Sequence, residues 1–438
     1  MLDPALAQLL PRTCEVRDGV LHLGGVSVTE LAATYETPVI AYDAADVTAA
    51  ALDWTHAFDD YAPGAMIAYA SKAFSSVGML RLLGDLGIGA DVASRGELES
   101  ALRAGIDPRR IVVHGNNKSR SELEAAVAAG VGLIVVDAAD ELELLTEVAA
   151  AASRPQSILV RLNPDIVVET HHYINTAHAG SKFGVPGDMA TELLRRAAQS
   201  PWLLPRGVHV HLGSQLLDVA PWAEVLTWLA AWALQLRDDH GIAIDVLDLG
   251  GGLGIAYTEQ DTPPAPADIA RTITDTLAHA WAPTGLPLPA LVLEPGRSIV
   301  GRAAMTIYTV GVVKDAGEIR YVNVDGGMSD NPRPVLYQAT YRALLGARMD
   351  DAPDGTWWVA GVHCESGDVL IEDAALPTPR AGDLLVVPAT GAYAASMAST
   401  YNMVPRCAVV LVEDGAHRLL LRRETLDDLF ARDAGVTP

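Results

Sequence analysis

The chain has 438 residues, half of them apolar, so its length predicts two or three domains with a large core. Its 55 acidic residues outnumber its 31 lysines and arginines, and the net charge of −24 argues against nucleic acid or anionic membranes as partners, since both demand basic surfaces. An anionic small ligand is not excluded, because it needs only a local basic pocket.

Cysteine usage indicates a reducing compartment. The three cysteines, Cys14, Cys364 and Cys407, are too few and odd in number for a disulfide framework. Residues 1–19 have no basic stretch before an apolar one, so we expect no signal peptide. No apolar run reaches about 18 residues, so no membrane span is expected. We therefore predict a cytoplasmic protein.

From residue 66, short apolar runs alternate with amphipathic helical segments. Each run is rich in β-branched residues or leucine and is short enough for a buried parallel strand. The eight runs cover 66–72, 89–94, 110–116, 132–137, 157–164, 207–214, 246–252 and 290–296. Between them, Ser94 and Ser119 stand where helix N-caps are expected. Eight units predict a (β/α)8 TIM-type barrel; a doubly wound sheet is the alternative, although it more often has about five to seven strands.

After residue 303 the pattern changes to short strands separated by turn residues, which is typical of an all-β region. Residues 14–28 are also strand-like and are expected to join it. We predict an α/β fold with a barrel over 43–302, inserted within a discontinuous C-terminal all-β domain made of 1–42 and 303–438.

Polar residues gather at the C-terminal ends of the predicted strands, and a barrel places those ends on one face, where its active site lies. Lys72 ends the first strand. A surface lysine is the common interpretation, but its apolar flanks and its place at the barrel mouth predict a desolvated amine with a lowered pKa, as a Schiff-base lysine requires. Residues 169–184, between the fifth and sixth strands, have no clean period and are typical of a functional loop.

Strands six and seven add a second group. The Gly250–Gly252 run follows strand seven, where barrels often bind phosphate; a tight turn is the alternative, and the spacing does not fit a dinucleotide-binding motif. His209 and His211 point the same way on strand six, so a zinc pair is an alternative, but no further ligands complete it convincingly. We favour His211 as a ring stacked on an aromatic cofactor, Ser214 as a phosphate donor and His209 as a core histidine.

Glu294, at the end of strand eight, could simply pair with an arginine. Beside a pyridine ring, it would favour the protonated ring, which is a strong electron sink for the carbanion that decarboxylation forms. Arg297 would meet a phosphate or a substrate carboxylate. Cys364 is either an inert buried thiol or part of a polar loop tip that reaches an active site. Tyr393 follows a glycine turn and could bind a phosphate or the substrate.

In order along the chain, these segments resemble the diaminopimelate decarboxylases, pyridoxal 5'-phosphate (PLP) enzymes related to ornithine and arginine decarboxylases and to alanine racemase. The resemblance covers nearly the whole chain and includes YASKA, HGNNKS, HVHLGSQ, LDLGGGLGIAY, EPGRSIVG, VDGGMSDNPRPVLY, HCESGD and GAYAASMASTYN. No single motif is decisive, but the ordered set is very specific.

The resemblance implies a role for each matched residue. The catalytic residues are Lys72, which holds PLP as a Schiff base, and Cys364, which donates a proton to the carbanion. The cofactor-binding residues are Lys72, His211, Ser214, Gly250, Gly251, Gly252, Glu294, Gly296, Arg297 and Tyr393. The substrate-binding residues are Arg297, Arg333, Tyr337, Glu365 and Tyr393. Cys364 and Glu365 are expected to serve the partner subunit, so an active homodimer with shared sites is implied.

The implied reaction is loss of CO2 from the D-centre of meso-diaminopimelate, giving L-lysine, the last step of lysine biosynthesis, with no metal. Departures from the family pattern at Arg95, Met403 and Cys407 remove no proposed catalytic group. They leave open a related decarboxylase for another basic or modified amino acid, such as ornithine, arginine or lysine. A non-catalytic PLP-binding homologue is the alternative from a different functional class.

Overall fold

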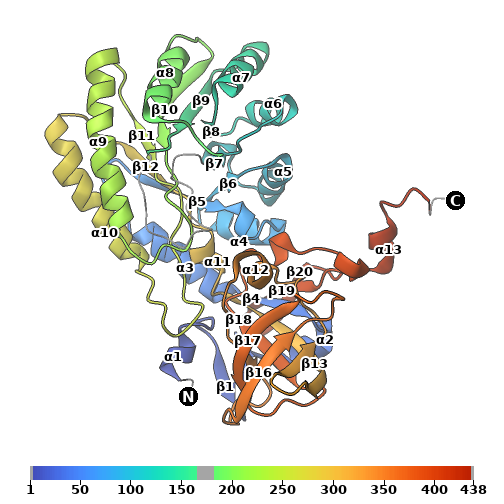
Figure 1. Ribbon diagram of the computed structural model, residues 1–438. Helices are drawn as coiled ribbons and strands as arrows, with labels where there is room; N and C mark the ends of the chain where they lie inside the picture. The colour runs from blue at the N-terminus through green and yellow to red at the C-terminus, as the bar shows by residue number, and fades with distance from the viewer. Residues whose placement is uncertain (1–2, 165–181, 436–438) are drawn as a thin grey trace. The chain divides into compact units, whose positions relative to one another are not determined.

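A computed structural model describes residues 3–164 and 182–435, in which the chain forms two compact units (Figure 1). The barrel unit consists of Ala51–Gly254 and Pro263–Gly296. The β unit consists of Met1–Ala50, Ile255–Thr262 and Arg297–Pro438. Most of the loop predicted at 169–184 lies outside the described residues.

Eight parallel strands close into a barrel, which confirms the predicted fold class (Figure 1). In chain order they are β5 (Ala65–Ala70), β6 (Gly89–Val92), β7 (Ile111–Val113), β8 (Leu133–Val136), β9 (Gln156–Arg161), β10 (Leu203–His209), β11 (Val246–Asp248) and β12 (Ala290–Leu293). Every predicted run overlaps one of them, although β10 begins four residues before its run. The strands form because their Val, Ile and Leu side chains are buried against the barrel interior or the surrounding helices.

The barrel helices follow the strands on the outside. They are α4 (Val77–Asp85), α5 (Arg95–Ala104), α6 (Arg120–Ala129), α7 (Ala139–Ala151), α8 (Gly187–Ala198), α9 (Ala220–His240) and α10 (Pro266–Thr276). Ser94 and Ser119 cap α5 and α6, as predicted, because their hydroxyls accept the backbone N–H of the residue three positions on. Gly105 and Gly130 end the same helices in the left-handed conformation.

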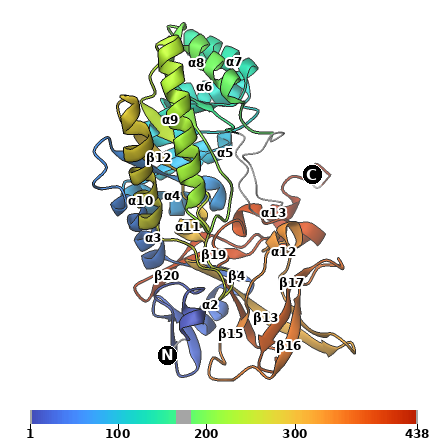
Figure 2. The same ribbon diagram turned by 60° about the vertical axis from the view of Figure 1, so that its left-hand side comes forward.

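The β unit is built on one large sheet in the order β17-β16-β14-β13-β4-β19-β20, with β18 pairing with both β13 and β15 (Figure 2). Its strands are β4 (Val39–Asp43), β13 (Ala304–Asp315), β14 (Arg320–Val324), β15 (Leu344–Leu345), β16 (Gly355–Ala360), β17 (Val369–Leu376), β18 (Leu384–Pro388), β19 (Ala408–Glu413) and β20 (Ala416–Leu421). Its helices are α1 (Pro4–Ala7), α2 (Val28–Tyr35), α11 (Arg297–Val300), α12 (Arg333–Tyr337) and α13 (Leu426–Phe430), while α3 (Ala44–His56) runs across the boundary at Ala50.

The N-terminal strands belong to the β unit but do not extend its large sheet. They are β1 (Glu15–Arg17), β2 (Val20–Leu23) and β3 (Val26–Ser27), and they form a separate three-stranded sheet. Leu21 and Leu23 are buried in one cluster with Met305 and Val410 of the large sheet. The N-terminal segment therefore joins the β unit through its hydrophobic core. None of the described helices is long and apolar enough to cross a membrane.

Candidate active site

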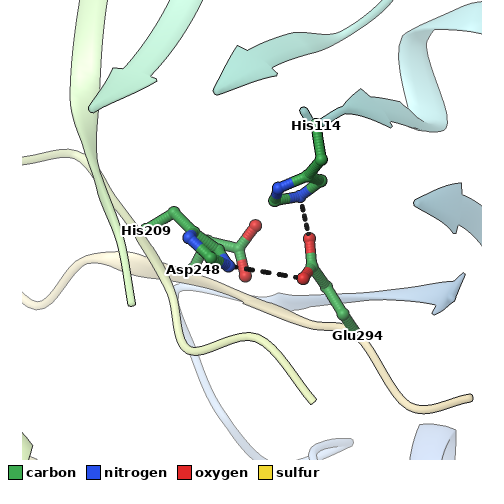
Figure 3. A group of neighbouring side chains, drawn as sticks. All are labelled: His114, His209, Asp248 and Glu294. Carbon is green, nitrogen blue, oxygen red and sulfur yellow. Dashed lines mark hydrogen bonds and ion pairs between the residues drawn. The ribbon is translucent and has the colours of Figure 1, made fainter. Parts of the chain in front are cut away.

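Four buried side chains, two from strand ends and two from positions directly after strands, meet at the C-terminal end of the barrel (Figure 3). His209 and Asp248 are the last residues of β10 and β11, and His114 and Glu294 directly follow β7 and β12. Because the strands are parallel and the barrel is closed, residues at these ends face one another across its mouth. We call these four residues the Glu294 cluster.

The Glu294 carboxylate lies between two imidazole rings. Its Oε1 is 2.5 Å from His114 Nε2, and its Oε2 is 3.4 Å from His209 Nε2, a polar contact that does not form a hydrogen bond (Figure 3). The two rings also contact each other edge to face, with centroids 4.7 Å apart. Asp91, at the end of β6, approaches His114 Nε2 to 3.8 Å. The carboxylate is therefore fixed in orientation from two sides.

The surroundings of the cluster favour the ionised form of Glu294 and the protonated form of Asp248. Burial alone would raise the pKa of Glu294, but His114 and His209 hold that pKa well below its usual range. Burial and the neighbouring Glu294 charge raise the pKa of Asp248. Burial lowers the pKa of His209 to about 3, so this ring is neutral. The cluster thus keeps one buried anion, on Glu294, which can stabilise a positive charge placed beside it.

The same four residues are also arranged so that they could hold a metal ion, because one ligand atom from each lies within 4.8 Å of the others. Two imidazoles and two carboxylates form a plausible divalent-metal set. His211, the other half of the zinc pair considered from the sequence, is not part of it. His209 is buried, as expected of a core histidine, but it contacts Glu294 rather than only core side chains.

Lys72 lies on the short 3-10 turn Ser71–Ala73 that directly follows β5. The expected desolvation of Lys72 is wrong for the single chain, in which the side chain is exposed although its neighbours Ser71 and Ala73 on the same turn are buried. Its charge still acts on the strand ends. Burial lowers the pKa of His211 well below its usual value, and the positive charge of Lys72 lowers it further. Lys72 and His211 therefore face the same end of the barrel.

A group of glycines after β11 and β12 fits an anion. A Cβ on Gly251 would lie 2.2 Å from the Glu294 carbonyl oxygen, and one on Gly252, whose φ is +115°, would lie 2.7 Å from that of Gly213. Only glycine fits so close to this backbone. The N–H groups of Gly251, Gly252 and Gly296 donate to no acceptor within the described part of the chain. Such uncommitted N–H groups are what a phosphate requires.

The chemistry of these barrel residues therefore fits PLP. An anionic carboxylate is available for a pyridine nitrogen, and backbone donors are available for a phosphate. Half-buried Ser214 follows the same strand end as His211. These features lie at one end of one barrel, as the sequence predicted for His211, Ser214, Gly250, Gly251, Gly252, Glu294 and Gly296.

In the β unit, two buried arginines share one tyrosine ring. The Cζ atom of Arg333 lies 4.5 Å from the centroid of Tyr257, and that of Arg297 lies 5.7 Å from it. Arg297 also lies 4.8 Å from the ring of Tyr393, which has a left-handed φ of +67°. A non-glycine residue in that conformation is strained and is often found at functional sites. The structure thus brings together Arg297, Arg333 and Tyr393, three of the predicted residues.

Tyr337 does not join this group. It ends α12, one turn after Arg333, and is 45% exposed, without a hydrogen bond or ring contact to any other described residue. Sequence reasoning instead gave no role to Tyr257 and Tyr341, which contact the arginines directly, or to His114 and Asp248 in the barrel. His114 and Asp248 could have been found from their places at strand ends, whereas the two tyrosines carry no such signal.

Cys364 and Glu365 lie exposed on a tight turn between β16 and β17. Asp368 anchors the turn, because its carboxylate accepts the backbone N–H groups of His363 at 2.9 Å and of Met328 at 2.6 Å. The Cys364 N–H donates to the Asn402 side chain at 3.0 Å. The loop tip predicted from the sequence is therefore present, and its thiol is accessible in the single chain.

Comparison with known proteins gives the family. The model of the pyridoxal-dependent decarboxylase pyridoxal-binding domain matches residues 44–301. The chain is 43% identical to the diaminopimelate decarboxylase of Halalkalibacterium halodurans over 95% of both sequences, and 42% identical to that of Bacillus subtilis, again over 95% of both. A crystal structure of diaminopimelate decarboxylase from M. jannaschii in complex with L-lysine superposes with a TM-score of 0.92 and 32% identity, covering 98% of each chain. The resemblance inferred from the motifs is confirmed, and the chain belongs to the diaminopimelate decarboxylase family of pyridoxal-dependent decarboxylases.

Proposed function

We propose that this chain decarboxylates meso-diaminopimelate at its D-centre, giving L-lysine and CO2, with PLP as cofactor. The observation that carries the proposal is the buried anionic Glu294 between two imidazole rings. PLP, when bound, supplies an electron sink for the carbanion that decarboxylation forms, and a carboxylate beside its ring nitrogen strengthens that sink by favouring the protonated ring. In alanine racemases an arginine is expected at this position, so Glu294 favours decarboxylation over racemisation.

The other barrel residues bind and orient the cofactor in this proposal. Lys72 attaches it through its Nζ, and the ring of His211 stacks on it. The backbone N–H groups of Gly251, Gly252 and Gly296, together with the Ser214 hydroxyl, hold the phosphate, and Gly250, whose own N–H donates to Asp248 at 2.9 Å, shapes the loop around it. In support, the N–H groups of Gly251, Gly252 and Gly296 have no protein acceptor within the described ranges.

The β unit contributes the groups that select the substrate. Arg333 is only 7% exposed and forms no ion pair with a carboxylate of any described residue. A buried cation without a counter-ion is costly, and a ligand carboxylate would compensate it. Arg297, Arg333 and Tyr337 hold the carboxylate of the substrate's non-reacting end. Tyr393 contacts phosphate and substrate.

We also propose that the enzyme is a homodimer with shared active sites. Exposed Cys364 donates a proton from its Sγ to the carbon that loses CO2, and exposed Glu365 takes the distal amine of the substrate, each in the site of the other copy of the chain. We infer a cytoplasmic location, which the three unpaired cysteines support.

A substrate panel tests the proposed function. PLP-loaded protein is incubated with meso-diaminopimelate or with the L isomers of lysine, ornithine or arginine, and CO2 release is measured. We expect release from diaminopimelate alone, and its loss in R333Q while the visible absorbance of bound PLP is retained. Release from ornithine or arginine would instead assign a related decarboxylase, and PLP binding without any turnover would assign a non-catalytic homologue.

A further inference from the structure

Two tyrosines that no motif singled out hold the arginines of the β unit in place. Tyr341 Oη accepts a short hydrogen bond from Arg333 Nη1, and Tyr257 Oη accepts one of 2.5 Å from Arg297 Nη1. The Arg333 guanidinium also lies over both rings, 4.5 Å from the centroid of Tyr257 and 5.5 Å from that of Tyr341. The two rings pack edge to face with centroids 5.2 Å apart. Each arginine is therefore fixed by a hydroxyl group and by an aromatic face.

The tyrosines are themselves held rigidly. Tyr257 is 6% exposed and Tyr341 is 2% exposed, and both belong to the hydrophobic core of the β unit. The backbone N–H of Tyr257 donates to the Asp261 carboxylate at 2.9 Å, which fixes the short segment Ile255–Thr262. Because neither ring can move without disturbing the core, the guanidinium groups have little rotational freedom.

The choice of tyrosine has an electrostatic consequence. A carboxylate partner would fix an arginine equally well, but it would neutralise the charge and compete with an anionic ligand. Burial alone would lower the pKa of Arg333, yet the oxygens of Tyr257 and Tyr341 raise it. Burial raises the pKa of Tyr341 to about 12, so its hydroxyl stays neutral. The tyrosines thus orient the arginines and leave their positive charge available.

We infer that Tyr257 and Tyr341 are positioning residues that hold Arg297 and Arg333 as a paired clamp for a second carboxylate, and so set the preference for a dicarboxylate substrate. This inference rests on the proposed function, because it assigns the clamp to the non-reacting end of the substrate. It adds two residues that act through the arginines rather than by contact with the reacting atoms.

The test compares Y341F and Y257F, which remove one hydroxyl each and keep the rings, with Y321F as a matched control. Tyr321 lies in the same unit, and its hydroxyl has no hydrogen bond to any described residue. Steady-state kinetics are measured with meso-diaminopimelate and with D-lysine, which has the same D-centre but no second carboxylate. Binding of pimelate, a dicarboxylate without amines, is measured calorimetrically on the PLP-loaded protein.

A hydrogen bond to a charged group of this kind corresponds to a factor of about ten to about a hundred. We expect Y341F and Y257F to raise the KM for diaminopimelate and the Kd for pimelate by at least about tenfold, with kcat and the D-lysine kinetics changed less than about threefold. Y321F should match the wild type. Unchanged KM and Kd values in both variants, or an equal loss with both substrates, would overturn the inference. A wild-type enzyme that binds pimelate but does not decarboxylate diaminopimelate would refute the proposed function alone.

Discussion

Removing His114 should weaken the charge on Glu294 in a measurable way. The H114F variant keeps an aromatic side chain at this position but loses the hydrogen bond of 2.5 Å to Glu294. Both side chains are at least nine-tenths buried, so solvent screens the bond little. A hydrogen bond to a charged group contributes about 1.5–3 kcal/mol, which is a factor of about ten to about a hundred in the preference for the anionic carboxylate. Without His114, the pKa of Glu294 rises, because burial is then opposed by fewer groups.

The assay is the pH dependence of kcat for CO2 release. Glu294 acts as an anion in the proposed mechanism, so a raised pKa moves the acid limb of the profile toward higher pH by the corresponding amount and lowers kcat on that limb by about ten- to a hundredfold. The control is H56Q, which alters an exposed histidine on α3. An H114F profile that superposes on the wild type, with bound PLP confirmed by visible absorbance, would refute the role given to the Glu294 cluster.

Three further predictions concern the cofactor, stability and metal. K72A should lose the visible absorbance of bound PLP and nearly all CO2 release; retained absorbance would contradict the attachment at Lys72. Burial raises the pKa of Asp330 to about 6, so its stabilising effect is fully present below about pH 4 and is lost as the pH rises through 6, by about 3 kcal/mol in all. D330N should therefore raise the melting temperature at pH 8 but not at pH 4, and an equal change at both pH values would contradict this account. Dialysis against a chelator should leave kcat unchanged, whereas a loss that Zn²⁺ restores would assign a metal to the Glu294 cluster.

The barrel could be predicted because its signal is local. Each strand is a short run of buried β-branched or leucine residues, and the caps at Ser94 and Ser119 depend only on neighbouring backbone groups. The placement of Lys72, His211 and Glu294 at one face then followed from a general property of parallel barrels. What this reasoning could not give was the exposure of Lys72, which depends on a turn of three residues.

The contact partners of the predicted residues could not be predicted from the sequence, because they come from distant parts of the chain. His114 and Glu294 are 180 positions apart and meet only because the barrel closes. Tyr257 follows the glycine loop of the barrel in the sequence, yet its segment packs in the β unit, beside Arg333. No periodic pattern reports such a change of unit. The domain boundaries at 43 and 302 and the roles of the individual site residues stay predictions.

The most direct test of the central claim is the stereochemistry of the product. PLP-loaded protein is incubated separately with the meso, LL and DD isomers of diaminopimelate, and the lysine formed is resolved by chiral chromatography together with CO2 measurement. The account predicts L-lysine and CO2 in equal amounts from the meso isomer and no lysine from the LL isomer, which has no D-centre. Formation of D-lysine from the meso isomer, or no lysine from it at all, would contradict the proposed reaction.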